Sequence, residues 1–374
     1  MDGLHPDVLA DPVALTRALV DIESVSGDEG PITDAVEAAL RGAGHRDAAH
    51  SGAGDRGAAR LTVERTGNTL VARTELGRPK RVVLAGHLDT VPVADNLPST
   101  VDGDYLYGCG TSDMKSGSAL VLWLAVNAPR PRYDISYVFY DCEEVEAVRN
   151  GLRKLAEARP DALAGDLAIL LEPTYGAVEA GCQGTMRARV TLTVRRAHAA
   201  RSWLGTNAVH AAGEVLRRLS DYAPRRVDIE GCEYREGLNA VRIAGGVAGN
   251  VIPDHCEVEV NYRFAPDLTV PAAEAHLREV FDGYALEVVD SAPGALPGLS
   301  AEPAREFLGV VGRPPAAKLG WTDVSRFAAL GIPALNYGPG DPNLAHTREE
   351  RVEIPKIREA ADTLAAWLAG PERA

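Results

Sequence analysis

The chain has 374 residues, a length that favours two domains because single hydrophobic cores rarely grow beyond roughly 250–300 residues. Hydrophobic residues make up 45% of the chain and charged residues 25%, as in ordinary globular proteins. Lysine and arginine number 39 and aspartate and glutamate 53, so the formal net charge is −14. This acidic balance argues against nucleic acid or an anionic membrane as the main partner, because both require a basic surface.

Cysteine usage and the distribution of apolar residues indicate a cellular compartment. The five cysteines are odd in number and widely spaced, and none forms a C-x-x-C pair. A zinc ribbon or a disulfide framework is therefore not expected, and a reducing cytoplasm fits the pattern best. We expect no transmembrane helix, because the sequence has no run of about 18 apolar residues. We also expect no secretory signal, since no basic segment followed by an apolar stretch opens the chain.

The first part of the chain alternates helices with short apolar strands. Asp11 followed by Pro12 is typical of a helix start. Further helices are expected over 31–40 and 116–126, and strands over 82–85, 135–140 and 167–171. Residues 42–60 are rich in glycine and small residues, which predicts a surface loop. Short apolar strands between helices indicate an α/β layer with a largely buried sheet.

After Gly184 the pattern changes to that of a half-exposed sheet. Apolar and polar residues alternate in the segments 187–194 and 256–264, and helical patterns lie near 208–219 and 272–281. The α/β pattern then resumes, with a strand at 332–337 and a closing helix over 355–368. We therefore expect an α/β domain formed by residues 1–182 and 293–374, interrupted by an α+β insert at 183–292.

Histidine or acidic side chains follow each expected strand of the α/β part. They are His87 and Asp89, Asp113, Glu143 and Glu144, Glu172, and, near the C-terminus, His346. Because ligands bind at the carboxyl ends of strands in open α/β sheets, these side chains can converge at one edge. Imidazole and carboxylate groups without a thiolate favour zinc or a similar divalent ion in a catalytic site.

The neighbouring acids suggest how such a site works. A carboxylate between two metal ions lets them share a water molecule, whose pKa then falls toward neutrality. The pair Glu143–Glu144 offers a spare acid beside a ligand acid, and the spare one can act as a base. Asp89 lies two residues after His87, on the same side of an extended segment, and can orient the imidazole. Alone, Asp113 reads as a helix cap and the acidic pair as a solvated helix start; their joint occurrence at five strand ends argues against those alternatives.

Several motifs resemble the co-catalytic dinuclear zinc amidohydrolases, a family that includes aminoacylases, acetylornithine deacetylases, succinyl-diaminopimelate desuccinylases and carboxypeptidases. They are GHLDTVP at 86–92, GTSDMKSG at 110–117, the Glu-Glu pair, Glu172-Pro-Thr and the final Ala-His-Thr. The match runs in order along nearly the whole chain. The resemblance implies a zinc aminopeptidase-like α/β/α catalytic domain with an inserted smaller α+β dimerisation or lid domain. It also implies a homodimer that binds two divalent ions per chain, zinc or else cobalt or manganese.

The resemblance assigns a role to each of these residues. It implies that His87, Asp113 and Glu172 bind one metal ion, and that Asp113 bridges to a second ion held by Glu144 and His346. Glu143 is then the general base and Asp89 the acid that orients His87.

The insert carries further residues of this family. The segment 196–208 resembles one that supplies a histidine, here His198, to the partner protomer's active site, where it stabilises the oxyanion. The alternative for His198 is a local cap. Arg263 is similar to an arginine that clamps a substrate carboxylate, and Asn250 to a polar residue near the same pocket. A structural role at a strand end is the alternative for both.

Longer stretches, including 181–184, 234–239 and 320–327, resemble the actinobacterial type of succinyl-diaminopimelate desuccinylases. This implies hydrolysis of N-succinyl-LL-2,6-diaminopimelate, a small N-acylated amino acid, to succinate and LL-2,6-diaminopimelate on the route to lysine and peptidoglycan. Such a substrate requires a basic pocket, for which Arg263, Arg201, Arg187 and Lys318 are candidates. Thr322 is a further expected substrate contact. An acetylornithine deacetylase, or a related N-acyl-amino-acid amidohydrolase or dipeptidase, shares every metal residue and is the alternative.

Overall fold

The computed structural model describes residues 4–50, 61–128 and 131–370 and divides into two compact units. The first unit consists of Met1–Ala180, Pro297–Ala316 and Arg326–Ala374, and the second of Gly181–Leu296 and Ala317–Ser325. The last of these segments was expected in the α/β domain. It belongs to the second unit because it bonds there: the Gln183 N–H donates to the Lys318 carbonyl, and the Ser325 hydroxyl donates to the Pro293 carbonyl.

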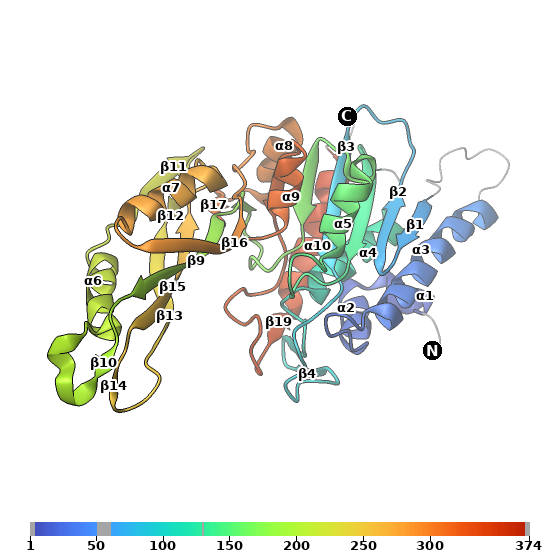
Figure 1. Ribbon diagram of the computed structural model, residues 1–374. Helices are drawn as coiled ribbons and strands as arrows, with labels where there is room; N and C mark the ends of the chain where they lie inside the picture. The colour runs from blue at the N-terminus through green and yellow to red at the C-terminus, as the bar shows by residue number, and fades with distance from the viewer. Residues whose placement is uncertain (1–3, 51–60, 129–130, 371–374) are drawn as a thin grey trace. The chain divides into compact units, whose positions relative to one another are not determined.

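An eight-stranded sheet forms the centre of the first unit (Figure 1). Its strands are β1 (Thr62–Thr66), β2 (Thr69–Arg73), β3 (Arg81–His87), β6 (Asp134–Tyr140), β7 (Leu167–Leu170), β8 (Glu179–Ala180), β17 (Ala316–Ala317) and β18 (Ala334–Asn336). The order is β1-β2-β6-β3-β7-β18-β8-β17, and the four strands β6, β3, β7 and β18 run parallel. These four strands are almost wholly buried, as their continuous apolar runs predict. Their carboxyl ends therefore meet at one edge.

Helices cover the sheet of the first unit, with α4 packed against β3 and α5 against β2 (Figure 1). They are α1 (Pro6–Ala10), α2 (Pro12–Val20), α3 (Gly30–His50), α4 (Lys115–Asn127), α5 (Gly151–Ala158), α8 (Glu302–Val311), α9 (Val324–Ala329), α10 (Ile354–Ala369) and the 3-10 helix η1 (Pro160–Leu163). Asp11 caps α2 as expected, because its side chain accepts from the Val13 N–H at 2.9 Å. Among the residues described, no helix combines the length and hydropathy that crossing a membrane requires.

The prediction of a loop over residues 42–60 is wrong for the first part of this range. Helix α3 continues to His50, and residues 51–60 lie outside the described residues. Alanine is the best helix former, and the alanines of this segment offset the helix-weakening effect of its glycines.

A small three-stranded sheet joins two distant segments of the first unit. It contains β4 (Thr100–Asp102), β5 (Tyr105–Tyr107) and β19 (Arg351–Glu353), in the order β19-β5-β4. Arg351 pairs with Tyr107, so the residues that follow β5 lie beside those that precede β19. The first of these segments leads to Asp113 and the second follows His346.

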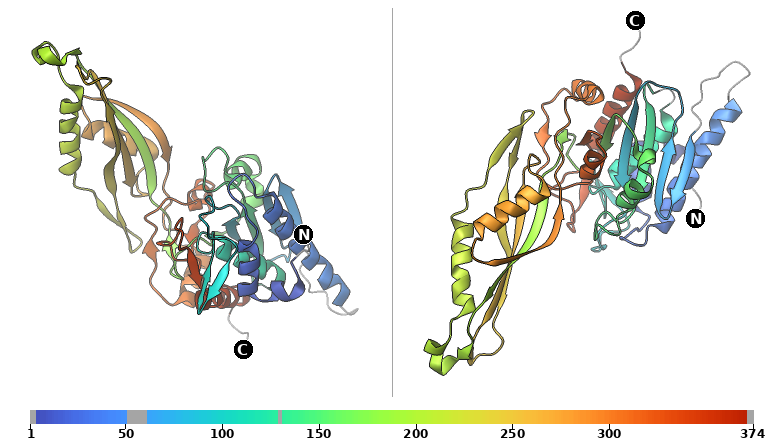
Figure 2. Two further views of the ribbon diagram at one scale, coloured as in Figure 1. Left: turned by 90° about the horizontal axis from the view of Figure 1, so that it is seen from below. Right: turned by 45° about the horizontal axis from the view of Figure 1, so that its top comes forward.

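The second unit is an antiparallel sheet with helices on one face (Figure 2). Its elements are β9 (Gly184–Thr193), β10 (Ala197–His198), η2 (Ala199–Leu204), α6 (Ala208–Ser220), β11 (Arg226–Ile229), β12 (Cys232–Arg235), β13 (Gly237–Gly245), β14 (Val251–Ile252), β15 (His255–Phe264), α7 (Val270–Val280) and β16 (Ala285–Ala292). The main sheet has the order β13-β15-β9-β16. Alternate side chains of β9 and β15 are buried against α6 and α7, which confirms the half-exposed strands expected from the alternating sequence.

Candidate metal centre

The expected ligands of the first unit lie where its parallel strands end. His87 is the last residue of β3, and Glu143 and Glu144 follow β6. Glu172 follows β7 and is buried, whereas His346 lies in the loop after β18 and is half exposed. The carboxyl edge of the sheet therefore collects histidine and acidic side chains from segments far apart in the chain.

Four of these residues contact one another around Asp113. His87 Nε2 lies 3.2 Å from Asp113 Oδ1, and His346 Nε2 lies 3.6 Å from Asp113 Oδ2. His346 Nε2 also lies 2.8 Å from Glu144 Oε1. Ligand atoms of His87, Asp113 and Glu144 all lie within 4.8 Å of one another. Each oxygen of the Asp113 carboxylate thus faces a different histidine, which is the arrangement that a carboxylate bridging two ions requires.

The donor set fits divalent metal ions. Imidazole nitrogens and carboxylate oxygens, without a thiolate, are the ligands of catalytic zinc and of similar ions. The cluster contains His87, Asp113, Glu144 and His346, whereas Glu172 lies at the end of the neighbouring strand, outside this group.

The electrostatics of the cluster also favour a cation. Burial of the His87 ring lowers its pKa, but hydrogen bonds with Asp113 and Asp89 outweigh burial and raise the pKa well above its ordinary value. The hydrogen bond that the His346 ring donates to the Glu144 carboxylate raises the pKa of His346 to about 9. Burial acts to raise the pKa of Asp89, yet its interactions with His87, with the Ser26 hydroxyl and with the Glu143 N–H together outweigh burial and lower that pKa to about 2. The carboxylates therefore create a negative potential at both imidazoles.

Asp89 contacts more than the histidine it was expected to orient. His87 Nδ1 lies 3.0 Å from the Asp89 carbonyl oxygen and 3.4 Å from Oδ1. The backbone N–H groups of Glu143 and Glu144 donate to the Asp89 carboxylate at 3.0 and 3.1 Å. The Ser26 hydroxyl donates to the same carboxylate at 2.7 Å. Asp89 therefore fixes the turn that carries the acidic pair, a contact that no local sequence pattern indicates.

Asp89→Asn is expected to lower kcat by about 10–100-fold, because the amide turns a donor toward groups that donate already. Steady-state kinetics with metal analysis checks this. Asp102→Asn is the matched control, since Asp102 is exposed on β4. If Asp89→Asn keeps wild-type turnover and metal content, Asp89 has no role in the site.

The expected residues of the insert form two separate groups within the second unit. His198 is exposed, and its Nδ1 accepts from the Ala200 N–H at 3.0 Å, which is the local capping role. In the neutral ring Nε2 then carries the proton and can donate. The Ala199 N–H donates to the Asn250 carbonyl at 2.9 Å, so His198, Arg201 and Asn250 share the β10–β14 end of the unit.

Arg263 and Thr322 lie at the other end of this unit. Arg263 is eight residues beyond the start of β15, about 26 Å away at about 3.3 Å per residue. It is half buried, and burial lowers the pKa of its guanidinium. Thr322 is buried, and its carbonyl accepts from the Cys182 thiol at 3.7 Å. The structure therefore does not bring Arg201 and Arg263 of one chain together.

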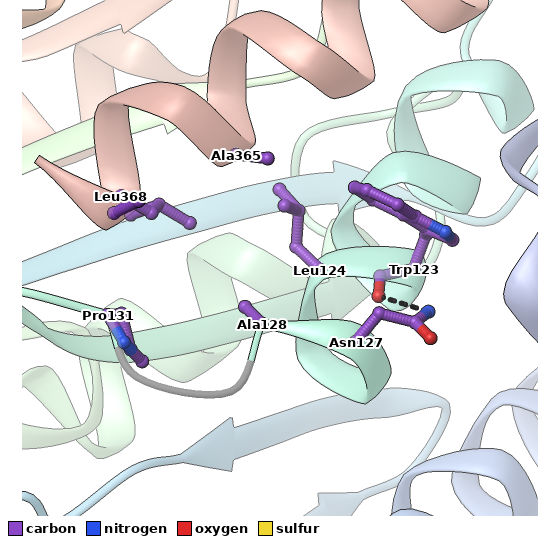
Figure 3. A pocket seen from close by; sticks show the side chains of 8 residues that line it. Trp123, Leu124, Asn127, Ala128, Pro131, Ala365 and Leu368 are labelled. Carbon is purple, nitrogen blue, oxygen red and sulfur yellow. Dashed lines mark hydrogen bonds between the residues drawn. The ribbon is translucent and has the colours of Figure 1, made fainter. Parts of the chain in front are cut away.

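A pocket in the first unit is lined by none of the expected site residues. It lies between α4 and α10, has a volume of about 340 Å³ and is lined by Trp123, Leu124, Ala365, Leu368 and their neighbours (Figure 3). Its polar contact is the bond from Asn127 Nδ2 to the Trp123 carbonyl at 2.9 Å. Within the described part of the chain, no titratable side chain lines this pocket, so it offers no group for acid–base chemistry.

Sequence comparison assigns the family. Residues 83–370 match the profile of peptidase family M20/M25/M40, and the chain belongs to this family. A Mycobacterium tuberculosis protein, provisionally named a succinyl-diaminopimelate desuccinylase, is 55% identical over 366 residues, which cover 97% of this chain and 99% of the relative. The Corynebacterium glutamicum protein of that name is 45% identical over 371 residues, 97% of either chain. The resemblance drawn from the motifs is thereby confirmed.

Solved structures confirm the fold. A tripeptidase from Staphylococcus aureus has a TM-score of 0.76 at 21% identity, covering 96% of this chain and 98% of that one. A dinuclear metal binding peptidase of the M20 family from Bacillus subtilis has a TM-score of 0.67 at 16% identity, covering 96% of both chains. The fold of this chain is therefore shared, over nearly the whole length, with both of these peptidases.

Proposed function

We propose that the protein hydrolyses the amide of N-succinyl-LL-2,6-diaminopimelate, releasing succinate and LL-2,6-diaminopimelate for lysine and peptidoglycan synthesis. The observation that carries this proposal is the identity of 55% and 45%, over nearly the whole chain, with relatives named for that reaction. The cluster of His87, Asp113, Glu144 and His346 supports a metal-dependent hydrolysis.

The metal site would hold two divalent ions, for which we propose zinc, with cobalt or manganese as alternatives. His87, Asp113 and Glu172 would bind one ion, and Asp113, Glu144 and His346 the other. The two oxygens of Asp113, facing different histidines, support its bridging role. When bound, such ions polarise an amide carbonyl and lower the pKa of a water molecule.

Glu143 is the general base in this proposal. It takes a proton from the attacking water and later delivers it to the departing amine. Its backbone N–H, bonded to Asp89 at 3.0 Å, holds it beside the ligand Glu144. In this proposal Glu143 transfers the proton and Glu144 binds the metal ion.

The substrate is bound by residues of the second unit. Arg263 suits a substrate carboxylate because its forked donors match a carboxylate and no ion pair engages it within the described residues. His198 donates its Nε2–H to the oxyanion that forms at the attacked carbonyl. Asn250, Arg201 and Thr322 complete the polar surroundings of the substrate.

We propose that two copies of the chain form the active enzyme. Arg263 and His198 lie at opposite ends of one second unit, so a single unit cannot present both to one ligand. The unit also exposes apolar side chains on α6 and on β13, an edge strand of its sheet: Val209, Leu216, Val241 and Ile243. Edge strands and exposed apolar patches are sites where chains associate. His198 would then act in the partner's site.

Ile243→Lys is expected to convert the dimer to a monomer at micromolar concentration, because it places a charge on the proposed interface. kcat should fall by about 10²-fold, as for loss of the histidine that acts between chains. Sedimentation velocity and turnover, measured together, check this. Val101→Lys is the control, since Val101 on β4 has the same 50% exposure as Ile243. A dimeric Ile243→Lys, or a fully active monomer, contradicts the proposed interface.

We place the enzyme in the cytoplasm. Its five cysteines are free and buried, which suits a reducing compartment, and the substrate is a small molecule.

The test is a paired assay with N-succinyl-LL-2,6-diaminopimelate and N-acetylornithine, with added zinc and with a chelator. Zinc-dependent release of succinate from the first compound alone is the expected result. Cleavage of the acetyl compound alone would keep the hydrolytic mechanism and replace the substrate. Absence of turnover on both would overturn the proposed reaction.

A further inference from the structure

A second buried acid holds the segment that carries Asp113. Glu350 is 2% exposed, and its carboxylate accepts three backbone N–H groups. Gly110 donates to Oε2 at 2.9 Å, and Ser112 and Asp113 each donate to Oε1 at 2.9 Å. The Glu350 carbonyl also accepts from the Gly108 N–H at 3.1 Å. One residue therefore binds the backbone of the segment 108–113 at four points.

Further bonds join this segment to the one that carries His346. The Ser112 hydroxyl donates to the Arg351 carbonyl at 2.8 Å and accepts from the Asp341 N–H at 3.1 Å. Pairing of β5 with β19 continues this connection beyond Glu350. His346 lies four residues before Glu350. The segments that carry the two expected ligands Asp113 and His346 are therefore joined by one network of hydrogen bonds.

The arrangement has a cost that a purely structural link would avoid. Burying a carboxylate is unfavourable unless its oxygens accept hydrogen bonds. An apolar contact could hold the same two segments together without that cost. Three converging donors fix the backbone on which the Asp113 side chain stands. That side chain must direct one oxygen to each histidine, at 3.2 Å from His87 and 3.6 Å from His346.

We propose that Glu350 is a positioning residue of the metal centre, which sets the Asp113 carboxylate between the two ions through the backbone of residues 110–113. The inference rests on the proposed metal-dependent function. Glu350 contacts neither the substrate nor the reacting atoms and acts through Asp113. The sequence offered one signal for it, an acidic pair shortly after the last histidine.

Glu350→Gln tests the proposal. The amide replaces one acceptor oxygen with a donor, so at least one of the three backbone N–H groups loses its partner. We expect the Kd for zinc, measured by competition with a chromophoric chelator, to rise by about 10–100-fold. At saturating zinc, kcat should fall while KM stays within about two-fold, because the substrate contacts are untouched. Glu349→Gln, a change at the exposed neighbour, should leave the zinc Kd and kcat unaltered.

Glu350→Asp is the second variant. It keeps the charge but withdraws the carboxylate by one methylene, and its zinc Kd should lie between those of the wild type and Glu350→Gln. A wild-type zinc Kd in either folded variant overturns the proposal. If neither variant folds, the carboxylate serves the fold and not the metal, and the proposal is again overturned. The zinc Kd needs no substrate, so a wild type that fails to cleave the succinyl compound would defeat the proposed function without touching this inference.

Discussion

Replacing Glu143 by glutamine is expected to lower kcat by about 10²–10⁴-fold while both metal ions stay bound. The amide cannot take a proton from water, yet it has nearly the same shape as the acid. The turn stays in place because Asp89 binds it through the backbone N–H groups of residues 143 and 144. Steady-state kinetics on the succinyl substrate, with metal content measured on the same sample, checks this.

The control for this variant is Glu146→Gln. Glu146 is an exposed acid three residues along the same loop, and its change should leave kcat near that of the wild type. Near-wild-type turnover of Glu143→Gln with two metal ions bound would assign the base to another group.

His198→Ala is expected to lower kcat by about 10²-fold or more, because it would remove the proposed donor to the oxyanion. KM should change little if the histidine acts mainly in the transition state. Because the side chain is exposed and caps only the short 3-10 helix η2, its loss should lower the free energy of unfolding by no more than about 1 kcal/mol. Kinetics together with thermal unfolding checks both expectations.

Mixing two inactive variants shows in which chain the histidine acts. His198→Ala keeps its own Glu143, and Glu143→Gln keeps its own His198. When the two chains are co-expressed in equal amounts, half of the proposed dimers should contain one of each, and activity should return to about a quarter of the wild-type value. No recovery, although mixed dimers form, would contradict a histidine that acts between chains.

Much of the fold follows from local sequence. The apolar runs predicted at 82–85, 135–140 and 167–171 are the central strands β3, β6 and β7, since strands buried on both faces must be apolar throughout. The alternating segments became β9 and β15, whose inner side chains face α6 and α7. Ligand types placed after such strands predict a metal site because parallel strands share one carboxyl edge.

What could not be predicted depends on contacts between distant segments. β4, β5 and β19 are three residues each, too short for a periodic pattern, and their pairing brings the Glu350 carboxylate within hydrogen-bond distance of the Asp113 N–H. The 317–325 segment joins the second unit through bonds to residues 183 and 293. The backbone bonds to Asp89 likewise arise only once β3 and β6 are paired. No local pattern encodes the partner in any of these cases.

The most direct measurement is a zinc titration of the metal-free wild-type protein, followed by release of succinate from N-succinyl-LL-2,6-diaminopimelate. The metal-free protein should be inactive, and turnover should rise to a plateau at two equivalents of zinc per chain, as a dinuclear site requires. Equal turnover in the metal-free protein, or a protein that binds no zinc, would contradict a metal-dependent hydrolase at His87, Asp113, Glu144 and His346.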